Sequence, residues 1–192
     1  MSSKLLFTHC SPLETAVVIE STGHPLYEIE TESNTVQKTT IVRKLDLNRG
    51  EENIPHTNEE IARIHWNLIV PDEVTFQGRT MAKERFIHKT GSGSEEHYII
   101  HAQGAEYRWI RRDRSDGSPK LVKSDQEQTF VAQFHRTCQL LPPDVKDSVL
   151  EVSPEGAFIL DHILVSFIFV EKEFRSRDKS PGRSPEPSTR SS

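Results

Sequence analysis

Histidine is the residue type in this chain that most invites a chemical role, because nine histidines are present and imidazole is a common metal ligand. Their spacing argues against a metal site. The H-E-x-x-H and C-x-x-C patterns, which place ligands around one ion, are both absent. His97 and His101 share a predicted strand, but their positions are separated by about 13 Å, too far to bind one ion. We therefore expect no metal and no cofactor.

Nucleophilic chemistry has equally little support. Cys138 follows His135 near a strand end with no acid to orient the imidazole, so we expect a buried or half-buried thiol. The G-x-S-x-G nucleophile motif is absent, and Gly91 and Gly93 lack the Lys-Ser/Thr that completes a phosphate-binding loop. The sequence predicts a protein that is not an enzyme and has no catalytic residue. An enzyme with an unrecognised site is one alternative.

Basic residues near the C-terminus are the candidate binding residues. They could contact an anionic surface, although neighbouring acids dilute their charge; they are Lys172, Arg175, Arg177 and Lys179. Ser180 and Ser184 each precede a proline in the polar segment 176–192, which cannot bury enough apolar surface to fold. These two serines are therefore candidate phosphorylation sites, and phosphate on them would oppose the nearby positive charge.

Aromatic and charged residues in the predicted interior have a structural interpretation. Five aromatic residues lie on the apolar side of their strands, so we expect them to pack in the core rather than to line a ligand pocket; they are Trp66, Tyr107, Trp109, Phe130 and Phe134. Asp161 and His162 interrupt an apolar segment. We expect both near the mouth of the fold, with Asp161 bound to backbone N–H groups or to an arginine.

Composition limits the partners and the compartment. The chain has 192 residues and a net charge of −5, which disfavours nucleic acid as a partner. Two cysteines are too few for a disulfide framework, and the N-terminal residues have no secretory apolar segment. We therefore expect an intracellular, most simply cytoplasmic, monomer.

Periodicity predicts the fold. Eight to ten short strands with turn signals between them precede one apolar segment, Ala157–Val170. That segment is too short for a membrane span and is apolar on every side, so a surrounding sheet is its natural environment. Ser153, Pro154 and Glu155 can start a helix, which we expect over about 156–174. The prediction is a mainly β (α+β) fold, an antiparallel β-barrel wrapped around a hydrophobic C-terminal helix.

Three regions follow from this reading: an N-terminal tail over 1–13, one barrel domain over 14–175, and a disordered tail over 176–192. The expected function is that of a binding module whose ligand is a protein partner or an anionic membrane surface. The second alternative is a membrane protein anchored by 157–170, which Asp161 disfavours because a charge near the bilayer centre is costly.

Several motifs together resemble a fungal domain-of-unknown-function family, numbered 6593, over about residues 14–175. The matching segments are Thr39-Thr40-Ile41, Ile61–Trp66, Gly104–Trp109, Val131–Arg136, Leu160–Phe167 and Val170-Glu171-Lys172. Gln103 stands where the family commonly has an aspartate before the hairpin glycine. More distantly, strands around a hydrophobic C-terminal helix resemble the tubby-like barrel, shared with LURP-one-related proteins. These resemblances imply a fold and no agreed activity.

Overall fold

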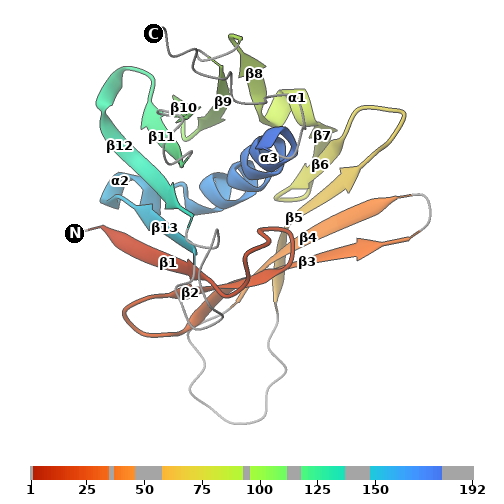
Figure 1. Ribbon diagram of the computed structural model, residues 1–192, viewed down its shortest axis with the longest axis horizontal. Coiled ribbons are helices and arrows are strands. Elements are labelled where there is room, and N and C mark those ends of the chain that lie inside the picture. Colours follow the sequence, from red (N-terminus) through yellow and green to blue (C-terminus); the bar gives the residue numbers. More distant parts are fainter. Residues whose placement is uncertain are drawn as a thin grey trace, which may run out of the picture.

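The computed structural model shows a mainly β protein, with one antiparallel sheet and a few helices (Figure 1). It describes residues 2–34, 37–45, 58–92, 96–111, 118–136 and 148–178. The strands are β1 (Ser3–Phe7), β2 (Thr15–Ile19), β3 (Pro25–Ser33), β4 (Lys38–Lys44), β5 (Glu59–Trp66), β6 (Glu73–Phe76), β7 (Arg79–Ala82), β8 (His88–Thr90), β9 (His97–Ala102), β10 (Ala105–Arg111), β11 (Pro119–Lys123), β12 (Gln126–His135) and β13 (Ser148–Val152). The helices are α1 (Lys83–Phe86), α2 (Pro154–Ala157) and α3 (Leu160–Asp178).

The sheet consists of two meanders joined by a single long-range pairing. Its order is β7-β6-β5-β4-β3-β2-β1-β13-β12-β11-β10-β9-β8. β1 pairs with β13 in antiparallel register, with Leu5 opposite Leu150. Residues 3–7 therefore form an interior strand, which differs from the expectation of an N-terminal tail over 1–13.

Tight turns set the local pairings: Gln103 and Gly104 have φ of 50° and 74° between β9 and β10, as a two-residue hairpin turn requires.

The sheet is curled but not closed. β7 and β8 are its two edges, and α1 connects them (Figure 1). Phe86 of α1 is buried and contacts Phe76 of β6 and Phe169 of α3. The antiparallel sheet of the prediction is confirmed, but its closure into a barrel is not. Between the edge strands β7 and β8, the buried side chain of α1 fills the position where a closed barrel would have a hydrogen-bonded strand pair.

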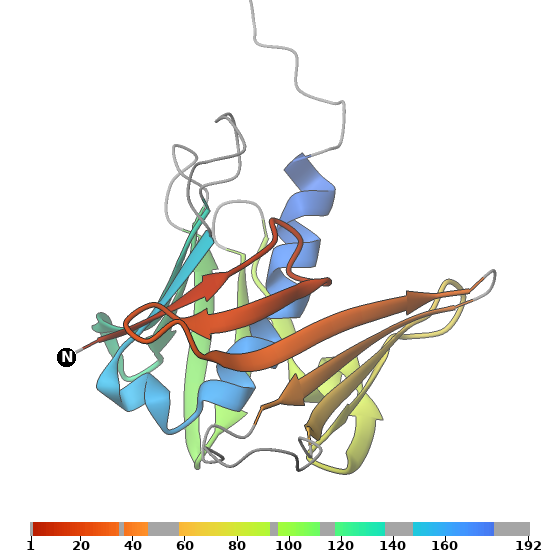
Figure 2. The same ribbon diagram turned by 90° about the horizontal axis from the view of Figure 1, so that it is seen from below.

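Helix α3 lies between the two meanders (Figures 1 and 2). Its apolar side chains belong to the same buried core as those of the strands. Phe167 contacts Phe7 of β1, Trp109 of β10 and Phe134 of β12. Five apolar residues of α3 are fully buried, as expected for a helix segment that is apolar on every side: Ile163, Leu164, Phe167, Ile168 and Val170. Among the described residues, no helix has the length and apolar content needed to cross a membrane.

The predicted single helix over 156–174 is two helices. Ser153 caps α2 by accepting a hydrogen bond from the Gly156 N–H at 3.1 Å, as its position before Pro154 predicts. Gly156 lies so close to Val131 and Val152 that a Cβ atom would be 2.6 Å from the Val131 carbonyl oxygen. The chain then turns through Phe158, which is 83% exposed, before α3 begins at Leu160.

Candidate functional site

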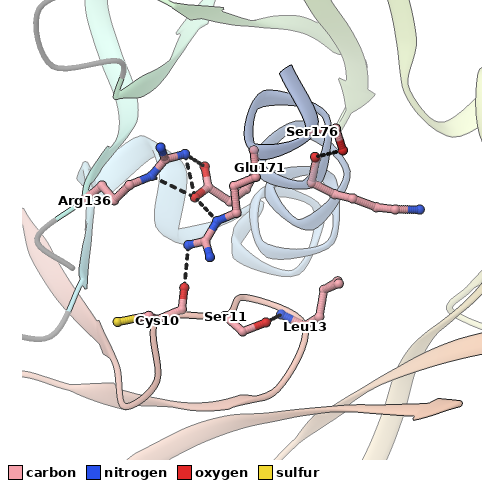
Figure 3. Close-up of polar contacts among 8 residues, drawn as sticks. Cys10, Ser11, Leu13, Arg136, Glu171 and Ser176 are labelled. Carbon is pink, nitrogen blue, oxygen red and sulfur yellow. Dashed lines mark hydrogen bonds and ion pairs between the residues drawn. The ribbon is translucent and has the colours of Figure 1, made fainter. Parts of the chain in front are cut away.

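A buried carboxylate between two guanidinium groups lies at the end of the fold where α3 leaves the sheet (Figure 3). Glu171 of α3 is fully buried. Arg136, just after β12, donates to both of its oxygens, with Nε 3.1 Å from Oε1 and Nη2 2.9 Å from Oε2. Arg175, one turn along α3, donates through Nε at 2.8 Å. The bidentate geometry is the one that guanidinium and carboxylate favour, so this cluster joins β12 to α3.

The same cluster reaches the loop between β1 and β2. Arg175 also donates through Nη2 to the backbone carbonyl of Cys10 (Figure 3). Cys10 is disulfide-bonded, a state that the count of two cysteines did not predict. The one other cysteine of the chain, Cys138, lies outside the described residues. Glu171 and Arg175 therefore connect three segments that are distant in the sequence: the end of β12, α3 and the loop between β1 and β2. Both charged groups have their partners within the fold.

The predicted anionic-surface residues that the structure describes each have a partner within the fold. Arg177 pairs with Glu96, with Nη1 2.5 Å from Oε1. Burial alone would raise the pKa of Glu96, but hydrogen bonds from Arg177, Lys89 and Tyr98 lower it overall. The Lys172 ammonium lies 3.4 Å from the centre of the Trp66 ring, a cation–π contact. The remaining predicted residues, Lys179, Ser180 and Ser184, lie outside the described residues.

A second polar cluster surrounds the first turn of α3. Asp161 accepts hydrogen bonds from the Tyr27 hydroxyl at 2.5 Å and from the Lys44 ammonium at 3.0 Å. Burial and the Asp161 carboxylate both raise the pKa of Tyr27 well above its ordinary value. The expectation that Asp161 binds backbone N–H groups or an arginine is therefore wrong: its partners are a tyrosine and a lysine from β3 and β4.

An exposed aliphatic triplet is the feature that the sequence analysis missed. Leu68, Ile69 and Val70 are 89%, 97% and 61% exposed. The alternation of apolar residues after Ile64 predicts that the strand continues through Val70, but β5 ends at Trp66. We name residues 67–72 the β5–β6 turn. The signal that could have located it is the polar pair Asn67 and Asp72, which flanks the triplet.

Hydrogen bonds at its base close the β5–β6 turn. The Asn67 N–H donates to Asp72 Oδ1 at 2.8 Å, and the Asn67 side-chain amide donates to the Pro71 carbonyl at 2.9 Å. Trp66, directly before the turn, is buried, and its indole N–H donates to Thr40 at 2.8 Å. The base of the turn is thus anchored in the core, while the three aliphatic side chains face solvent.

Comparison with protein families decides where the chain belongs. The model of a family of unknown function, DUF6593, matches residues 11–176. The chain belongs to this family. No curated protein and no solved structure is significantly similar to it. The DUF6593 match covers both meanders from β2 onward and nearly all of α3, so the sheet and the helix form one family domain.

Most of the aromatic residues of this DUF6593 domain pack as the sequence predicts. Trp66, Tyr107, Trp109 and Phe134 are buried. Phe130 is only half-buried, with the Lys120 ammonium 5.8 Å from its ring centre. Among the described residues, no three histidine, cysteine or carboxylate side chains are grouped so that they could hold a metal ion.

His162 gives the DUF6593 domain a predicted acid sensitivity. Its ring packs against Phe76 at 4.5 Å and lies parallel to Phe86 at 6.4 Å. Burial lowers the pKa of His162, and the adjacent Asp161 opposes this only in part. The unfolded chain therefore binds this proton more readily than the fold does. Stability should be complete above about pH 6.5 and should fall as the pH drops from there toward the lowered pKa.

The measurement is thermal unfolding of the wild type and of His162→Phe between about pH 7.5 and about pH 5.5. The phenyl ring keeps the aromatic packing and cannot bind a proton. The variant should lose less stability on acidification than the wild type does. Equal losses in the two proteins would show that His162 is not a source of the acid sensitivity.

Proposed function

We propose that this domain is a non-enzymatic binding module whose ligand is a protein partner or an anionic membrane surface. The exposed triplet of the β5–β6 turn is the observation that carries this proposal. Fully burying an aliphatic side chain contributes about 1.5–3 kcal/mol, so three of them provide a large part of the free energy of a weak, reversible complex. In the free domain these three side chains are exposed, so they contribute nothing to the hydrophobic core.

The polar clusters support binding rather than catalysis. Glu171 is saturated by two arginines, and Asp161 is saturated by Tyr27 and Lys44. In the described part of the chain, every buried side-chain nitrogen or oxygen has a hydrogen-bond partner. A catalytic group needs a polar atom that is available to a substrate, and these clusters instead join strands to α3.

A relation of the fold to a known class of β-barrels is part of the same proposal. The curled antiparallel sheet, with α3 packed against strands of both meanders, supports a relation to β-barrels that hold a central helix, of the tubby-like kind. A fungal origin is also part of this proposal, and it rests on the sequence resemblance alone. A fold relation of this kind carries no activity with it.

Proximity labelling in the native host tests the proposal. The wild type is compared with a triple variant of the turn, Leu68→Ser/Ile69→Ser/Val70→Ser, and with Phe158→Ser as the matched control, because Phe158 is also an exposed apolar residue. We expect the triple variant to lose a set of labelled neighbours that the control keeps. Identical neighbours for all three proteins would contradict a binding role for the turn.

A further inference from the structure

We propose that the β5–β6 turn docks the domain on a lipid bilayer, with Leu68, Ile69 and Val70 entering the boundary between headgroups and acyl chains. This inference rests on the proposed function and names the partner of the same surface. It differs from the predicted basic surface at the C-terminus, where Arg175 and Arg177 are paired with carboxylates.

The chemistry of the turn favours lipid over protein. Its exposed residues are aliphatic, and the turn contains no aromatic residue and no arginine. Protein interfaces obtain most of their affinity from tryptophan, tyrosine and arginine, whereas leucine and valine are under-represented among their energetic centres. Acyl chains need no such specific partners, because they accept any apolar surface.

The shape of the turn points the same way. The β3–β4 and β5–β6 hairpins project from the body of the domain (Figure 2), and β4 and β5 are hydrogen-bonded neighbours up to the pair Lys38 and Trp66, directly before the turn. A specific protein interface buries about 800 Å² on each partner, which is more than the tip of one turn offers. A membrane requires only a few inserted side chains and some favourable charge.

Two lysines lie beside the triplet in positions suited to anionic headgroups. Lys172 contacts the face of Trp66, and Lys38 is exposed opposite Trp66 on β4. Burial lowers the pKa of Lys172, while Asp72 acts against that effect. Asp72 accepts the hydrogen bond that closes the turn. Asp72 offsets one of the two lysines, so a small net positive charge remains. Apolar insertion should therefore dominate, and added salt should weaken binding only modestly.

The turn is also preorganised for insertion. Its base is fixed by the hydrogen bonds of Asn67 to Asp72 and to Pro71, and by the buried Trp66. The triplet therefore needs little ordering when it binds, which reduces the entropic cost of association. Insertion should be shallow, because backbone groups in the turn need water or headgroups as hydrogen-bond partners.

Vesicle sedimentation of the full chain is the test. The probes are phosphatidylcholine vesicles with and without phosphatidylserine. The wild type should bind both, and phosphatidylserine should strengthen binding. Leu68→Ser/Ile69→Ser/Val70→Ser should weaken binding to both by about tenfold or more, whereas Lys38→Gln should lower only the phosphatidylserine-dependent part, by about fivefold. Phe158→Ser should bind as the wild type does, and thermal melts should show that every variant is folded.

Absence of wild-type binding, or unchanged binding by the triple variant, would overturn the membrane proposal. Sedimentation velocity then separates that failure from a failure of the proposed function. Concentration-dependent self-association that the triple variant abolishes would retain the binding module with a second copy of the chain as its partner. Vesicle binding that only Lys38→Gln weakens would also overturn insertion of the triplet.

Discussion

Phe167→Ala should lower the free energy of unfolding by about 3–5 kcal/mol, the range expected for removing a fully enclosed aromatic side chain. The Phe167 ring centre lies 5.5 Å from that of Phe7, 6.0 Å from that of Trp109 and 4.4 Å from that of Phe134. Alanine would leave a cavity against strands from both meanders. Chemical denaturation of the purified domain measures the loss.

Phe158→Ala is the matched control for this prediction. It is the same change of residue on the same C-terminal segment, but Phe158 is 83% exposed. Its effect should stay within about 0.5 kcal/mol, as for most surface substitutions. A loss below about 1 kcal/mol for Phe167→Ala would mean that the ring is not enclosed. Deleting all residues after Glu155 is the extreme case, and it should leave a sheet that cannot fold cooperatively.

Glu171→Gln should cost about 3–5 kcal/mol, because it removes the charge of the buried carboxylate to which the guanidinium groups of Arg136 and Arg175 both donate. For a chain of this length, the melting temperature should fall by about 6–20 °C. The side chain of Arg136 is 9% exposed, so water offers it little compensation. Thermal unfolding followed by circular dichroism gives the shift directly.

Glu173→Gln separates the effect of burial from that of charge. Glu173 is two residues further along α3, pairs with Lys83 at 2.9 Å and is 36% exposed. Its loss should cost at most about 1 kcal/mol, as for other exposed ion pairs. The double variant Glu171→Leu/Arg136→Met should recover much of the lost stability, because it removes both buried charges. Equal effects of Glu171→Gln and Glu173→Gln would contradict this account.

Local signals made much of the fold predictable. The turn at Gln103-Gly104, the cap at Ser153 and the apolar segment of α3 each depend on a few neighbouring residues. The features that differ from the prediction depend on distant ones. β1 is only five residues long and is fixed by β13, about 150 positions away. The sheet is open where α1 connects its two edge strands. This helix has only four residues, too few for a helical periodicity to be recognised in the sequence.

The candidate sites were less predictable for the same reason. A sequence shows that Arg175 and Arg177 are basic, but not that they pair with Glu171 and Glu96. Glu96 is far from Arg177 in the chain and meets it only through the packing of α3 beside β9. The exposure of the triplet was not predictable for a different reason. Leu68 and Val70 continue the apolar alternation of β5, although the strand itself ends at Trp66.

The order of elements has a consequence for synthesis of the chain. All the strands that the structure describes precede α3 in the sequence, so a ribosome makes the sheet before the helix that packs against it. At about 5–20 residues per second, the first meander waits several seconds for β13 and α3. During that interval its apolar face is open to other nascent chains. We expect molecular chaperones that hold extended apolar segments to govern the yield of this protein in cells, more than its final stability does.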